Sequence, residues 1–366
     1  MKIICTQENL KSGLFLVGRV IPSATSLPIL NNILLKTNNG MLKISSTNLE
    51  IAINTQIRCK IEEEGESAVA SKTIIELINT LPNKNLTLET INNTIKIEAE
   101  NYHTLIKTLP ADDFPLIPEI ENDNPLFIDA QELKSALDRV VFAASNNQTQ
   151  PEIAGTLFRI EEKKLKVVAT DRYRLAEKTL HLNNQNQNPQ EFIIPQKTAT
   201  ELSRIIGNQE GKVAIVTNLT QISFNFLDTQ VISRLVDGQY PPYEQIIPNN
   251  FSTTIVTKRE PLINALKAGA IFCQNSNSIT LEYISEKKEL ILTSESGELG
   301  KNTVELESKI EGTSGSIIMN YRYILDCLNC IRAENVVIKI VNDSSPSLIT
   351  SEENENYLYL VMPIKI

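Results

Sequence analysis

One phrase occurs three times in the chain and constrains the fold more than any other feature. The stretch LKVVATDRYRLA begins at Leu165, and the similar stretches LKISSTNLEIAI and LILTSESGELGK lie before and after it. Each is an apolar run followed by a turn rich in Ser and Thr, a pattern that indicates a β-hairpin. Val168 lies 124 residues from both Ile44 and Leu292. This spacing predicts a module written three times in 366 residues.

Helix-like segments repeat in the same phase as the hairpins. Apolar residues three and four positions apart predict six helices, at residues 7–20, 71–81, 130–145, 196–207, 259–273 and 320–332. The second helix of each repeat begins with a basic residue, and these residues, Lys72, Lys197 and Arg322, are spaced by 125 positions. Three elements in one order favour triplication over chance similarity.

Two proline-rich stretches separate the repeats. Residues 109–125 and 233–250 combine several prolines with turn residues and cannot continue a helix or a central strand. We therefore expect linkers there and three domains, at residues 1–124, 125–250 and 251–366.

Composition excludes several classes of protein. No apolar run approaches the roughly 18 to 20 residues of a membrane span, and the N-terminus has no secretory signal, so we expect a cytoplasmic protein. Five cysteines without a disulfide framework fit reduced thiols. Cys327 and Cys330 form a CxxC, but they lie in a helix-like apolar run, so we interpret them as core thiols. With two histidines in the chain, we expect no metal and no cofactor.

The charge is unevenly distributed. The net charge is −9, which argues against a nucleic-acid partner. The six expected helices, however, carry 11 basic and 7 acidic residues, a net +4, which leaves −13 for the rest. A mildly basic helical surface in an acidic body is one interpretation, and ordinary scatter between helices and strands is the other.

Five motifs in order resemble the bacterial sliding clamp family, the β subunit of DNA polymerase III: SLPILNNILL, LPADDFP, ATDRYRLA, SRLVDGQYPPY and the terminal VMPIKI. The resemblance implies an α+β fold with three tandem clamp-type domains, each with two helices packed on antiparallel sheets. It implies a homodimer joined head to tail into a ring around duplex DNA, without reading sequence. It also implies a processivity factor without catalysis. The implied partners are the replicative DNA polymerase catalytic subunit, an ATP-driven clamp loader, and other polymerases and repair proteins.

The resemblance also assigns site residues. The DNA-facing candidates are Lys72, Lys197 and, more weakly, Asn147; Ala24 stands where the family can carry an arginine. A hydrophobic pocket for short Gln/Leu/Phe-containing peptides is expected from Ile153, Thr170, Tyr173, Arg174, Leu175, Pro241, Ile246, Val361, Met362 and Pro363. Thr170 and Arg174 are expected to orient the polar end of the peptide. Gln245 and Arg172 depart from the family pattern, so peptide preference can differ here.

The subunit contact is expected between two edge strands. It would involve Tyr102, Thr104, Ile106 and Lys107 of one chain, and Ile271, Phe272, Glu305 and Glu307 of the other. Lys107 facing Glu305 or Glu307 would supply the electrostatic part.

Two other functions compete with this interpretation. An enzyme could use Asp171 as an acid at the hairpin turn, but a turn-capping or arginine-pairing role is favoured by Arg172 and Arg174 nearby. No phosphate-binding, esterase or zinc-protease motif occurs. A repeat-built scaffold without a DNA role is the second alternative.

Overall fold

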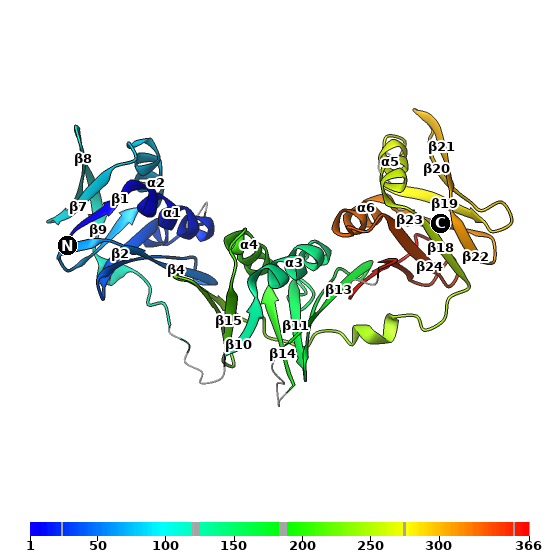
Figure 1. Cartoon of the computed structure of the whole chain (residues 1–366), viewed down its shortest axis with the longest axis horizontal. Coiled ribbons are helices and arrows are strands. Elements are labelled where there is room, and N and C mark those ends of the chain that lie inside the picture. Colours follow the sequence, from blue (N-terminus) through cyan, green and yellow to red (C-terminus); the bar gives the residue numbers. More distant parts are fainter. Residues whose placement is uncertain are drawn as a thin grey trace. The chain divides into compact units, whose positions relative to one another are not determined.

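The computed structural model describes residues 1–22, 25–118, 120, 125–182, 189–273, 276–353 and 356–365 (Figure 1). The chain divides into two compact units. One unit contains Met1–Glu132 and Glu201–Leu235, and the other contains Leu133–Thr200 and Val236–Ile366. No helix formed by the described residues is long and apolar enough to cross a lipid bilayer.

Six α-helices occur in the described residues, and all six were predicted. They are α1 (Gln7–Val17), α2 (Ser71–Thr80), α3 (Ala130–Val140), α4 (Gln196–Ile206), α5 (Arg259–Ala270) and α6 (Tyr321–Cys330). The predicted ends of α1 and α3 were too late, because each last turn tightens into a 3₁₀-helix, η1 (Gly18–Val20) and η4 (Val141–Ala143). Shorter 3₁₀ segments elsewhere are η2 (Pro28–Asn31), η3 (Ala111–Asp113) and η5 (Tyr243–Ile246).

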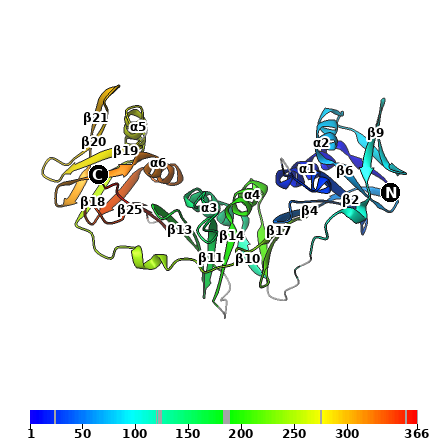
Figure 2. The ribbon, with the colours of Figure 1, turned by 180° about the vertical axis from the view of Figure 1, so that it is seen from behind.

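The first unit is built on one antiparallel sheet of thirteen strands. In spatial order they are β10 (Leu126–Asp129), β15 (Lys212–Thr217), β16 (Gln221–Phe226), β17 (Thr229–Arg234), β4 (Ile51–Arg58), β3 (Met41–Thr47), β2 (Asn32–Asn38), β6 (Glu66–Ala70), β9 (Tyr102–Leu109), β8 (Thr94–Ala99), β7 (Asn85–Ile91), β1 (Lys2–Thr6) and β5 (Lys60–Glu63). Helices α1 and α2 pack side by side in this unit (Figures 1 and 2). Gly13 allows α1 to approach the sheet, since a Cβ there would lie 2.7 Å from Cδ1 of Ile44.

The second unit has two antiparallel sheets. The nine-stranded sheet contains, in order, β14 (Gln190–Pro195), β11 (Gly155–Glu161), β12 (Lys164–Thr170), β13 (Arg174–His181), β26 (Tyr357–Val361), β25 (Ser347–Ser351), β24 (Asn335–Ile340), β18 (Thr253–Lys258) and β22 (Lys309–Gly312). The four-stranded sheet contains β21 (Gly300–Glu307), β20 (Glu289–Ser296), β19 (Ser278–Ile284) and β23 (Gly315–Asn320). Helices α5 and α6 pack side by side (Figures 1 and 2).

Equivalent hydrogen bonds mark the start of each repeat. The first residue of α1, α3 and α5 donates its backbone N–H over 2.9 Å to the carbonyl of Lys84, Gly211 and Glu334, respectively. Each acceptor directly precedes a strand, and that strand pairs with the strand that leads into the helix. The same bond in three places, with two helices in each repeat, confirms the predicted triplication. The domain boundaries at 124/125 and 250/251 stay a prediction.

The strand register corrects the predicted spacing of the hairpins. The residue before α2, α4 and α6 pairs with Asn32, Gly155 and Ser278, respectively. In β2, β11 and β19, the residues three positions after Asn32, Gly155 and Ser278 pair with Ile44, Val167 and Leu292 of the next strand, respectively. Val167, rather than the predicted Val168, is therefore the equivalent of Ile44. A period-2 strand makes this one-residue shift consequential, because it changes the face on which each side chain lies.

Two junctions join repeats through a strand pair. In the first unit β17 pairs with β4, and Val231 lies opposite Ile53. In the second unit β13 pairs with β26, and Ala176 lies opposite Tyr359. These residues occupy the same positions of their repeats, so the two junctions are built in the same way.

Candidate functional site

The turn between β12 and β13 is held by two side chains. Asp171 accepts hydrogen bonds at Oδ1 from the backbone N–H groups of Tyr173 and Arg174, both at 3.0 Å. The hydroxyl of Thr170 donates to the carbonyl of Arg174 over 2.6 Å and accepts from the N–H of Arg172 over 3.2 Å. Arg172 has a φ of +77°. Positive φ at the first central residue indicates a type II′ hairpin turn, where glycine is the usual residue.

The first repeat contains the same turn with neutral residues in the places of Asp171, Arg172 and Arg174. Asn48 accepts from two backbone N–H groups in the place of Asp171, and Thr47 makes both hydrogen bonds that Thr170 makes. Leu49 has a φ of +74°. Ile51 occupies the position of Arg174. The turn geometry is therefore a property of the module, whereas the ion pair belongs to the second repeat.

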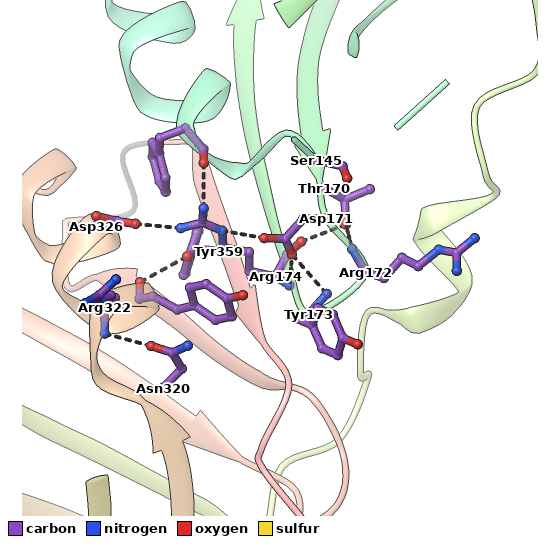
Figure 3. A network of polar contacts seen from close by, with 12 residues as sticks. Ser145, Thr170, Asp171, Arg172, Tyr173, Arg174, Asn320, Arg322, Asp326 and Tyr359 are labelled. Atoms are coloured by element: carbon purple, nitrogen blue, oxygen red, sulfur yellow. Dashed lines mark hydrogen bonds and ion pairs between the residues drawn. The ribbon is translucent and has the colours of Figure 1, made fainter. Parts of the chain in front are cut away.

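Arg174 fastens this turn to two other segments, as Figure 3 shows. Its Nε lies 2.9 Å from Oδ2 of Asp171, its Nη1 lies 2.5 Å from Oδ2 of Asp326 on α6, and its Nη2 donates over 2.7 Å to the carbonyl of Phe142 in η4. The guanidinium also lies 4.5 Å from the ring centre of Tyr323 and 5.4 Å from that of Phe142. Every guanidinium nitrogen has a partner, so Arg174 is a structural clasp.

The environment of Arg174 keeps it charged. Burial disfavours the cation, but Tyr359, Asp326 and Asp171 outweigh burial and raise the pKa of Arg174 above its usual value. The side chain of Arg174 is 12% exposed, whereas that of Asp326 is 43% exposed. Removing the partners of such a shielded cation would leave its charge uncompensated, which is strongly unfavourable.

The linker after β17 packs against the same sheet. Tyr240 and Tyr243 join a buried cluster whose other members are Leu157, Val168, Leu175, Ile193 and Leu360. The hydroxyl of Tyr243 donates to Glu177 over 2.6 Å, and Arg159 lies 5.3 Å from its ring centre while pairing with Glu244 and Glu191. These contacts fix η5 beside β13.

The C-terminal residues continue past β26 along both sheets of this unit. Met362 donates its N–H to the carbonyl of Tyr173, and Ile364 donates to the carbonyl of Ile318, both over 2.8 Å. Met362 and Pro363 are half-buried. The tail thus lies directly beside the β12–β13 turn.

The predicted pocket residues all lie in this unit, but with different degrees of exposure. Four of them are buried and serve the core: Ile153, Thr170, Leu175 and Val361. Three are half-buried: Arg174, Met362 and Pro363. Three apolar ones are exposed: Tyr173, Pro241 and Ile246. Tyr173, whose carbonyl accepts a hydrogen bond from Met362, therefore offers an exposed ring beside the tail, and three of the five N–H donors of Arg174 are used in the clasp.

Several residues that shape the site were not predicted. Asp326 and Phe142 complete the clasp, and Glu177 anchors Tyr243. Asp326 is 152 residues from Arg174, and no local pattern signals such a contact. Asp171 caps the turn and pairs with Arg174, as predicted.

The predicted DNA-facing lysines are both exposed. Lys72 and Lys197 are the second residues of α2 and α4, and Arg322 is the exposed second residue of α6. Asn147 is exposed, but its Oδ1 accepts two hydrogen bonds from Thr149 and so helps to shape its loop. Ala24 lies outside the described residues.

The predicted subunit-contact strands have free edges. Residues 102–107 of β9 pair with β8 alone, and β21 pairs with β20 alone in the described part of the chain. Tyr102, Lys107, Glu305, Glu307 and Ile271 are exposed, and Thr104 and Phe272 are half-buried. Ile106 is buried at 7% exposure, so its side chain serves the core.

The thiols are poorly suited to chemistry. Burial raises the pKa of Cys330 to about 12 and raises that of the fully buried Cys327 well above its usual value. Among the described residues, no group of three His, Cys, Asp or Glu side chains is placed to hold a metal.

Comparison with known proteins gives one family. The N-terminal, central and C-terminal domain families of the DNA polymerase III β subunit match residues 1–118, 127–242 and 244–365. The chain is 28% identical to the β sliding clamp of Synechocystis sp., with all of both chains covered. It resembles the crystal structure of the Bacillus subtilis sliding clamp (25% identity, 100% and 99% coverage, TM-score 0.97) and that of a Pseudomonas aeruginosa sliding clamp bound to griselimycin (27% identity, full coverage, TM-score 0.96). The chain therefore belongs to the family of bacterial β sliding clamps, the β subunits of DNA polymerase III.

Proposed function

We propose that two copies of this chain close into a ring that encircles duplex DNA, with domains at residues 1–124, 125–250 and 251–366. The observation that carries the proposal is the repeated strand junction. Two of the three junction positions in each chain are paired, β17 with β4 and β13 with β26. In the third pair of equivalent strands, residues 102–107 of β9 and the strand β21 each keep one free edge within the described part of the chain. Heterologous contacts of this kind form closed rings when the rotation per unit divides the circle.

The repeats also give a register for the missing junction. The strand pairings within each module show which positions are equivalent. On β9 the equivalent of Val231 in β17 and of Tyr359 in β26 is Thr104, and on β21 the equivalent of Ile53 in β4 and of Ala176 in β13 is Asn302. We infer that Thr104 lies opposite Asn302 of the second copy. Lys107 then lies opposite Leu299, and the contact between Lys107 and Glu305 is not favoured.

Disulfide trapping tests this register. The double variant T104C/N302C should give a covalent dimer on mild oxidation, because opposite residues in an antiparallel pair bring their Cβ atoms within about 5.5 Å. The variant K107C/E305C is the matched control, since it samples the other register on the same two strands. Cross-linking of the control but not of T104C/N302C would contradict the inferred junction.

DNA contact is proposed at the starts of the second helices. Lys72, Lys197 and Arg322 place a cation at each helix N-terminus, where unpaired N–H groups already favour an anion. Contacts with phosphates alone do not read sequence and permit sliding. We propose a cytoplasmic location and a role in processivity rather than in catalysis.

Retention on DNA separates a clamp from a scaffold. The chain, loaded on nicked circular DNA, should remain bound through gel filtration and should be lost when the circle is linearised. A scaffold would show no dependence on that cut.

The polymerase and other partners are proposed to bind the apolar surface beside the C-terminal tail. Tyr173, Ile246 and Met362 offer apolar side chains, and a flexible methionine suits a surface that accepts several peptides. The candidate partners are the replicative polymerase catalytic subunit, a clamp loader, and other polymerases and repair proteins with short Gln/Leu/Phe-containing peptides. The Pseudomonas aeruginosa clamp bound to griselimycin supports a ligand site in this family.

Removing the tail tests the placement of this site. Deletion of residues 362–366 should abolish binding of a fluorescent Gln/Leu/Phe-containing peptide, while the dimer persists in gel filtration, because the proposed ring contacts lie on other strands. Unchanged peptide affinity would refute the placement.

A further inference from the structure

Two arginines two residues apart have different surroundings in the candidate peptide site. Arg174 is bound by Asp171, Asp326 and the carbonyl of Phe142. Arg172 is exposed, and no carboxylate in the described part of the chain pairs with its guanidinium. Figure 3 shows its side chain extending away from Asp171 and Asp326. The available cation beside this surface is therefore Arg172.

The turn itself does not require an arginine at this position. Arg172 has a φ of +77°, a conformation that favours glycine, and the equivalent residue of the first repeat, Leu49, has a φ of +74°. The two turns share their hydrogen bonds, with an apolar residue in one and a cation in the other. The charge of Arg172 thus contributes nothing that the turn needs.

Two carboxylates of the neighbouring segments are already paired. Asp171 pairs with Arg174, and Glu244 in η5 pairs with Arg159. Gln245, beside Glu244, is exposed and neutral. Tyr173, the next residue of the turn, is 64% exposed, and Ile246 in η5 is 48% exposed. A ligand that covers Tyr173 brings its own polar groups toward the guanidinium of Arg172, which lacks an anionic partner in the described part of the chain.

We propose that Arg172 is a specificity-determining residue that selects peptides carrying an Asp or Glu next to their apolar anchor residues. The inference rests on the proposed peptide binding at this surface and adds the chemistry of the preferred ligand. An arginine in water forms an ion pair of modest strength, which discriminates between ligands without dominating their affinity.

Paired peptides test the proposal. Synthetic peptides containing Gln, Leu and Phe would carry Asp or Asn at one position, moved in turn across each position beside the apolar residues. Affinities would be measured by fluorescence anisotropy with the full-length dimer, the variants R172Q and R172E, and the control R332Q, which removes an exposed arginine outside the site. Thermal unfolding of each variant would verify that it is folded.

At one or more positions, the wild-type chain and R332Q should bind the Asp peptide about 2- to 5-fold more tightly than the Asn peptide, with the preference declining at high salt. The preference should vanish in R172Q and reverse in R172E. Binding without any Asp preference, or with a preference that survives in R172Q, would overturn the role of Arg172 and leave peptide binding intact. Failure of every peptide to bind would contradict both proposals.

Discussion

At the scale of single residues, the clasp around Arg174 accounts for how the candidate site is held together. The cation joins the β12–β13 turn, η4 and α6 through three hydrogen-bonded partners. The sequence predicted that Asp171 would cap the turn or pair with an arginine, because Asp before a tight turn has that chemistry. It did not predict Asp326, since a pair 152 residues apart depends on tertiary packing.

Replacing Arg174 with Gln should destabilise the protein by about 2–3 kcal/mol, because it leaves two carboxylates and a partly buried carbonyl without their cationic partner. Urea unfolding measures the change. The control D326N should cost less, since Asp326 is 43% exposed and its pairing is screened by water. Equal losses in R174Q and D326N would contradict the clasp.

The thiols should be slow to react in the folded protein. Burial and the neighbouring Cys59 raise the pKa of Cys5 to about 12, and that of Cys330 is also about 12. At pH 8 the thiolate fraction is then about 10⁻⁴, and it rises with pH. Iodoacetamide followed by mass spectrometry should modify both residues slowly in buffer and rapidly in urea. Rapid modification of Cys330 in the native protein at pH 8 would contradict its placement.

At the scale of elements, helices and hairpins followed from local patterns, but strand partners did not. The six helices were predicted from apolar spacing, and the basic second residues of α2, α4 and α6 follow the 125-residue interval. The one-residue offset between Val168 and Val167 was missed because two adjacent valines give the same local signal. Which strand of one repeat meets the next is set by pairing over more than 170 residues, as for β17 with β4.

Charge reversal at the helix starts should separate stability from DNA binding. A cation at a helix N-terminus is unfavourable, so K72E and K197E should each raise the free energy of unfolding by about 0.3–1 kcal/mol while reducing retention on circular DNA. The control K267E alters an exposed lysine in the last turn of α5, where a cation is favourable, and should lower stability instead. Unchanged DNA retention in the double variant K72E/K197E would remove these residues from the interface.

At the scale of the whole molecule, one rule explains the repeats and the proposed assembly. Each module presents one strand that pairs with a strand of the next module, at β17–β4 in one unit and β13–β26 in the other. At the ends of the series, the equivalent strands are β9 and β21, and among the described residues β9 at 102–107 and β21 each have one free edge. Triplication was predicted from the sequence, whereas the strands that serve as junctions became visible only from the pairing.

The mass of the native protein tests the central claim most directly. The chain has a mass of 40.9 kDa, so native mass spectrometry at micromolar concentration should give a single species of about 82 kDa, twice that value. A species of 40.9 kDa alone would contradict the closed ring of two copies.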